Sequence, residues 1–153
     1  YEEKMGKPFL LSRYANSVEV YIVSDNVRKA LHWNNKILNS EEIETYIDYY
    51  TNSRLCEIII HYELDNLEKV DSLLKSYQLL LAKNKGEYQY EKCMLRFLKN
   101  LINQDDEKEL LKSFKSMKEE LLELSKDPFE KGAFYFFDLI PWLDKKIKKH
   151  SRK

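Results

Sequence analysis

The chain has 153 residues, 43% of them apolar, so it is long enough to bury a hydrophobic core without disulfides or structural metal ions. It contains only three glycines and three prolines, which excludes a fold built on many hairpin turns. Its 26 basic and 26 acidic side chains cancel, so no overall charge favours nucleic acid, an anionic membrane or an acidic substrate.

Apolar residues recur at steps of three and four along almost the whole chain, which predicts an all-α fold. We expect about seven antiparallel helices, stacked as helix-turn-helix hairpins. The predicted hairpins cover residues 8–38, 41–84 and 88–125. Within them, the predicted helices span about 8–23, 27–38, 41–64, 66–84, 88–103 and 106–125.

A capping helix is expected after the hairpins, over residues 127–147. Asp127, Pro128 and Glu130 supply an N-cap residue, a proline for the first turn and an N3 glutamate in the required order. Pro141 should kink or end this helix. A basic tail is expected over residues 148–153.

The first residue and the two cysteines indicate what kind of protein the chain belongs to and where it is located. Residue 1 is Tyr rather than Met, so we expect a fragment of a longer protein. No apolar stretch approaches the roughly 20 residues that a membrane-spanning helix needs. Cys56 and Cys93 lie in helical patterns without a CxxC motif, which predicts two buried free thiols and a cytoplasmic location.

The chain also matches itself, without gaps, at a spacing of 40 residues. The turn at Asp25-Asn26 aligns with turns at Asp65-Asn66 and Asp105-Asp106. The apolar residue seven positions before the first aspartate of each turn aligns as well, as Val18, Ile58 and Leu98. We expect an aspartate side chain at each turn to accept a hydrogen bond from the free backbone amides of the next helix.

These residues carry a family resemblance. Tyr14, Tyr21, Ala30 and the turn at Asp25-Asn26 fall at the spacing seen in tetratricopeptide-like helix pairs. The chain therefore resembles a divergent segment of tetratricopeptide-like hairpins, of the kind found in C-terminal regions of uncharacterised bacterial proteins. Val18 stands where that family usually has a small residue, which predicts that the paired helices lie farther apart.

Motifs for chemistry are missing from the sequence. His32, His61 and His150 each lack a second histidine or a cysteine at a helical step, so no metal site is predicted. Three isolated glycines cannot form a phosphate-binding loop. We expect no catalytic, cofactor-binding or metal-binding residues, no small-molecule substrate and no enzymatic activity.

Two surfaces are candidates for partner binding. Tyr49 and Asn52 are expected on the face that lines the concave groove of a tetratricopeptide-like array, and tyrosine is favoured at interfaces. Trp142 belongs to the aromatic surplus of the predicted capping helix over 127–147, which could dock another domain or subunit.

The sequence therefore predicts a non-enzymatic scaffold that binds a protein or peptide on the concave face of the first helices of each hairpin. Self-association is a further possibility, and nucleic acid is not expected as a partner. The alternative is a membrane-peripheral, dimerising or regulatory appendage that acts through residues 127–147 and the basic tail.

Overall fold

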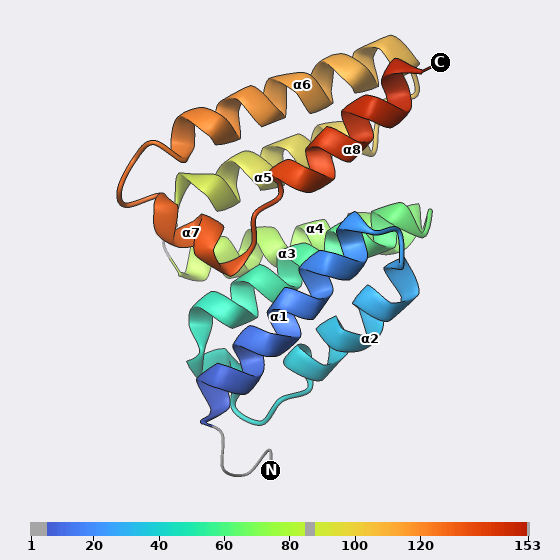
Figure 1. The fold of residues 1–153 in the computed structure, drawn as a ribbon. Coiled ribbons are helices and arrows are strands. Elements are labelled where there is room, and N and C mark those ends of the chain that lie inside the picture. Colours follow the sequence, from blue (N-terminus) through green and yellow to red (C-terminus); the bar gives the residue numbers. More distant parts are fainter. Residues whose placement is uncertain (1–5, 85–87, 153) are drawn as a thin grey trace. The chain divides into compact units, whose positions relative to one another are not determined.

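A computed structural model describes residues 6–84 and 88–152 of the chain. Over these ranges it contains eight α-helices and one short 3-10 helix but no strand, which confirms the all-α prediction (Figure 1). The chain divides into two compact units, residues 1–66 and residues 67–153. The division falls at Asn66, inside the predicted hairpin of residues 41–84.

The first unit is built from three α-helices and the 3-10 helix η2. These are α1 (Lys7–Val23), α2 (Val27–Leu38), η2 (Ile43–Thr45) and α3 (Ile47–Glu63). Helix α1 packs against α2 and α3, and α2 also packs against α3 (Figure 1). Helix α3 is buried on nearly all sides, at Thr51, Ser53, Leu55, Cys56, Ile58, Ile59, Ile60 and His61.

Helix α3 begins six residues later than its sequence pattern predicts. Residues 43–45 form η2 instead, and the residue before it, Glu42, has a left-handed backbone (φ 58°) that no α-helix accommodates. The hydroxyl of Ser40 donates to the carbonyl of Lys36, in the preceding helix, at 2.7 Å. The predicted start at residue 41 is therefore wrong, because the chain first closes α2 and then turns.

The first two repeat turns share one backbone geometry. Asp25 and Asp65 are left-handed, with φ values of 65° and 61°. The backbone N–H of Asn26 donates to the carbonyl of Tyr21 at 2.9 Å, and the N–H of Asn66 makes the equivalent bond at 3.0 Å. This six-to-one bond after a left-handed residue is the Schellman motif that ends a helix. Each aspartate thus helps to end the preceding helix through its backbone conformation.

The second unit contains five helices. These are α4 (Leu67–Lys83), α5 (Gln89–Leu101), α6 (Glu107–Leu124), α7 (Lys131–Phe136) and α8 (Ile140–Ser151). Helix α4 packs against α5, α5 against α6, and α6 against α8. Helices α2, α4 and α6 begin at residues 27, 67 and 107, so the second helix of each predicted pair follows the 40-residue spacing.

The third repeat turn differs from the first two. Asp106 has an extended backbone, and its side chain accepts a hydrogen bond from the backbone N–H of Lys108 at 2.8 Å. An aspartate cap of the expected kind therefore forms at this turn, at the start of α6.

The predicted capping helix over 127–147 is two helices. Phe137 is extended (φ −161°), and Asp138 accepts a hydrogen bond from the backbone N–H of Ile140 at 3.0 Å. Pro141 then occupies the first turn of α8, where its missing N–H costs nothing. The predicted tail of residues 148–153 is also corrected, because α8 continues to Ser151.

A buried carboxylate holds the start of α5. Glu130 is 3% exposed, and its two oxygens accept hydrogen bonds from the backbone N–H groups of Gln89 (2.8 Å) and Tyr90 (3.2 Å). These amides are among the unsatisfied donors of the first helical turn, where negative charge is also favoured. A Cβ at Gly132 would lie 2.8 Å from the Tyr88 hydroxyl, so the segment carrying Glu130 approaches α5 closely.

No helix in the part of the chain that the structure describes has both the length and the apolar character required to cross a membrane.

Candidate functional site

The two partner-binding residues predicted on α3 are half-buried, and each contacts its own unit. The Tyr49 hydroxyl lies 3.5 Å from the carbonyl oxygen of Pro8, at the start of α1. The side-chain amide of Asn52 lies 3.9 Å from the Cys56 sulfur. Both residues therefore lie on α3, as predicted. The Tyr49 hydroxyl faces the start of α1, and the Asn52 amide faces Cys56 on α3 itself.

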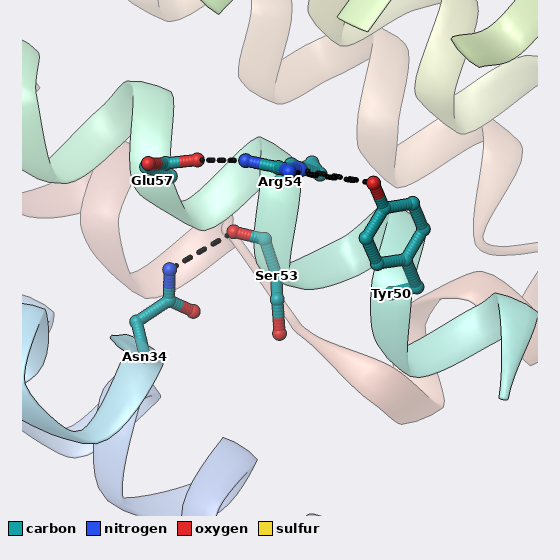
Figure 2. A network of polar contacts seen from close by, with 5 residues as sticks. All are labelled: Asn34, Tyr50, Ser53, Arg54 and Glu57. Atoms are coloured by element: carbon teal, nitrogen blue, oxygen red, sulfur yellow. Dashed lines mark hydrogen bonds and ion pairs between the residues drawn. The ribbon is translucent and has the colours of Figure 1, made fainter. Parts of the chain in front are cut away.

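The same helix carries a polar network (Figure 2). Arg54 donates to Glu57 Oε2 at 3.0 Å and to the Tyr50 hydroxyl at 3.3 Å, and Figure 2 shows its side chain lying between these two groups. From α2, the Asn34 amide donates to the Ser53 carbonyl at 3.0 Å. Asn34 is fully buried, and its Oδ1 has no hydrogen-bond partner within the described residues. The bond from Asn34 joins α2 to α3 within the first unit.

Trp142, the third predicted site residue, is a core residue of the second unit. Its side chain is 1% exposed. Its ring centroid lies 6.5 Å from that of Phe97 and 6.0 Å from that of Phe114, both edge to face. Aromatic rings in this arrangement stabilise a core beyond the area that they bury. A side chain so deeply buried offers no surface to a partner, and we do not propose Trp142 as a contact.

A groove lies between α4 and α5, in the second unit. Its volume is about 560 Å³, within the range typical of ligand sites. The lining is mainly apolar and includes Leu81 and Ala82 of α4 and Leu95 of α5. Leu81 is buried and Leu95 is half-buried, so leucine side chains line the groove between the two helices.

Three cations line the groove from α5. Lys92, Arg96 and Lys99 are spaced by four and three residues, which places them on one face of the helix. Lys99 donates to the side-chain oxygen of Gln78, on α4. None of the described residues that line the groove is acidic. The groove thus combines an aliphatic lining with a positively charged edge.

Behind this edge, Arg96 belongs to a three-residue cluster with Cys93 and Glu120 of α6. Arg96 donates a hydrogen bond to Glu120 Oε1. The Cys93 thiol donates to the same oxygen, with an S···O distance of 3.0 Å. The bond from Cys93 lowers the pKa of the Glu120 carboxyl against the opposing effect of partial burial, and Arg96 lowers it further. The pair of Arg96 and Glu120 is half-exposed, so it contributes only about 0.2–1 kcal/mol after screening by water.

The cysteines are poor nucleophiles in these surroundings. Burial, reinforced by the hydrogen bond and the negative charge of Glu120, raises the pKa of Cys93 to about 11. Burial also raises the pKa of Cys56, which is 1% exposed. Both side chains are therefore thiols near neutral pH, and both are free, as the sequence predicts.

Two further observations concern ligands. A smaller polar cleft of about 230 Å³ lies between α5 and α6, and Arg96 and Asn100 line both this cleft and the α4–α5 groove. Among residues 6–84 and 88–152, no group of three or more histidine, cysteine, aspartate or glutamate side chains has the geometry to hold a metal ion.

Sequence reasoning missed the groove for a definite reason. The step from Lys92 to Arg96 to Lys99 is visible in the sequence and could have indicated a basic face on the helix over 88–103. The neighbourhood of Leu81 and Leu95 is not visible, because it depends on the angle at which α4 and α5 pack.

No family model matches the sequence, and neither a curated protein nor a solved structure matches it. The chemistry of the groove is therefore what bears on function.

Proposed function

We propose that this chain is a non-enzymatic binding module that takes a segment of a partner protein in the groove between α4 and α5. The observation that carries the proposal is the groove between the two helices, which has an aliphatic lining of Leu81, Ala82 and Leu95 and an edge of cations. An apolar groove with a polar rim is a common site of protein recognition.

A helix or an extended segment fits this groove better than a globular surface does. The volume of about 560 Å³ accommodates a few side chains rather than a whole domain. Two neighbouring helices with an apolar groove between them present the surface against which a third amphipathic helix docks. We place the site here rather than at Tyr49 and Asn52, because those side chains already contact Pro8 and Cys56.

The helix pairs themselves are proposed to be divergent tetratricopeptide-like repeats. Two features support this reading. The second helices of the pairs begin at residues 27, 67 and 107, and the first two turns share a left-handed aspartate followed by the same backbone hydrogen bond. Repeats of this kind commonly serve as binding scaffolds.

A photo-crosslinking residue at Ala82 tests the site directly. Ala82 is exposed and lines the groove, whereas Lys115 is exposed on α6 and serves as a matched control position. In cells that produce the protein natively, we expect position 82 to crosslink one discrete polypeptide that position 115 does not. Leu95→Asp should abolish that crosslink, because a charge in the apolar lining opposes burial.

Equal crosslinking at positions 82 and 115, or a crosslink that survives Leu95→Asp, would contradict the proposed site. Circular dichroism of the Leu95→Asp variant checks that its helices remain formed.

A further inference from the structure

The groove carries a charge pattern as well as an apolar surface, and the pattern is helical. Lys92, Arg96 and Lys99 occupy positions i, i+4 and i+7 of α5 along the groove. A second helix lying along this edge would repeat its own side chains at the same steps. Carboxylates at those steps would meet the three cations in turn.

The cations are also open to new partners. Lys92 is exposed and makes no ion pair with any residue that the structure describes. Lys99 has the neutral oxygen of Gln78 as its partner. Arg96 pairs with Glu120, a carboxylate of α6 that lines the neighbouring cleft rather than this groove. An incoming carboxylate therefore gains two cations without breaking an ion pair, and competes with one half-exposed pair for the third.

Two classes of negatively charged ligand could pair with these cations, and the lining of the groove distinguishes between them. Single-stranded nucleic acid binds through aromatic side chains on which its bases stack, and the described groove residues include no aromatic ring. A leucine-lined hollow instead accepts aliphatic side chains, which an amphipathic helix presents at steps of three and four.

We infer that the occupant of the groove is an acidic amphipathic helix, which places leucine-type side chains against Leu81 and Leu95 and its carboxylates against Lys92, Arg96 and Lys99. On binding, Arg96 exchanges its partner, from Glu120 of α6 to a carboxylate of the incoming helix. This inference rests on the proposed function, because it names the partner chemistry of the same groove.

Three synthetic peptides of about 16 residues, long enough to form helix on docking, test the inference. The first has leucines along one face and flanking glutamates, the second replaces the glutamates by lysines, and the third replaces the leucines by serines. By fluorescence anisotropy at low salt, the first should bind at least about tenfold more tightly than either of the others. Its affinity should fall as salt is added, because salt screens exposed charges.

Protein variants locate the binding. The double variant Lys92→Glu/Lys99→Glu should weaken the acidic peptide by about tenfold or more, since two attractions become repulsions. Lys108→Glu/Lys115→Glu is the matched control, because it reverses two exposed lysines with the same spacing of seven residues on α6. The control should bind within about twofold of the unchanged protein.

The partner exchange of Arg96 has its own test. Glu120→Gln removes the competing charge while keeping an oxygen to accept from Cys93, so it should tighten the acidic peptide by about two- to threefold. Unchanged or weaker binding by this variant would overturn the exchange.

The two proposals fail in different ways. If the acidic peptide binds no better than the lysine peptide while the Ala82 crosslink persists, the groove is a binding site but its occupant is not an acidic helix. If the acidic peptide binds equally to the Lys92→Glu/Lys99→Glu variant, it binds elsewhere and the inference is overturned.

Discussion

The fully buried Asn34 of the first unit is neutral and has one hydrogen bond, whereas the buried Glu130 of the second unit carries a carboxyl group that accepts two. The Asn34 amide donates to a carbonyl that already lies inside helix α3. Glu130 instead satisfies amides at the start of α5 that have no acceptor within their own helix. A buried polar side chain thus contributes most to stability where it satisfies backbone groups that have no hydrogen-bond partner within their own helix.

Matched apolar replacements should separate these two roles. Glu130→Met keeps the shape of the side chain but leaves the buried N–H of Tyr90 and the part-buried N–H of Gln89 without an acceptor, so we expect unfolding free energy to fall by about 2 kcal/mol. Asn34→Leu removes one hydrogen bond together with an unsatisfied oxygen, so we expect a change within about 1 kcal/mol. Urea denaturation of the whole chain measures both.

Glu119→Ala is the control for this pair, because Glu119 is an exposed glutamate of α6. A Glu130→Met variant that is no less stable than Asn34→Leu would show that the capping carboxylate contributes little.

The units also differ in their turns, and glycine substitutions sharpen that difference. Asp25 and Asp65 in the first unit adopt a positive φ, which glycine accepts without steric cost. We expect Asp25→Gly/Asp65→Gly to raise unfolding free energy by about 1 kcal/mol in thermal or urea denaturation. Asp105, aligned with them in the second unit, is not among the described residues with positive φ.

Asp105→Gly should therefore lower stability, by about 0.5 kcal/mol, because glycine adds only freedom to the unfolded chain. The same sign of change for Asp105→Gly and for the double variant would contradict the difference in turn geometry.

The two cysteines provide the smallest expected effect. Glu120→Gln removes a negative charge that raises the pKa of Cys93, so alkylation of Cys93 by iodoacetamide at mildly alkaline pH should quicken by about threefold. Cys56, in the first unit, is 1% exposed and should stay unmodified in both proteins. Peptide mass spectrometry measures each site separately.

The direction of the pH effect follows from the raised pKa of Cys93. Because the folded state favours the thiol, the stability it contributes is complete below the ordinary thiol pKa of about 8.5. It is lost as the pH rises through that value to about 11.

The alkylation experiment has its own control. Faster alkylation of Cys93 in a Glu119→Gln variant as well would show that the effect is not specific to Glu120.

The periodicity of apolar residues was sufficient to predict the helical class and most helix positions. Local chemistry explains this success, since a helix forms from residues a few positions apart. The starts of α2, α4 and α6 follow the 40-residue spacing, because the turn residues that precede each of them recur at that spacing in the sequence.

Boundaries were predicted poorly where two local signals compete. Asp138 and Pro141 form the start of a new helix as readily as a kink in an existing one, and the sequence pattern of the flanking residues is apolar in either case. Likewise, an aspartate at a turn can cap the next helix with its side chain or end the previous one with its backbone. Asp25 and Asp106 show that both outcomes occur in this chain.

The sequence by itself determined the helices, the repeat spacing, the free thiols and the absence of a recognisable catalytic motif. Only the tertiary structure decided that Trp142 is buried, that Glu130 caps a helix 40 residues away along the chain, and that Leu81 and Leu95 line one groove. The physical reason is range. Helix formation depends on neighbours along the chain, whereas burial, capping at a distance and grooves depend on which helix faces pack together.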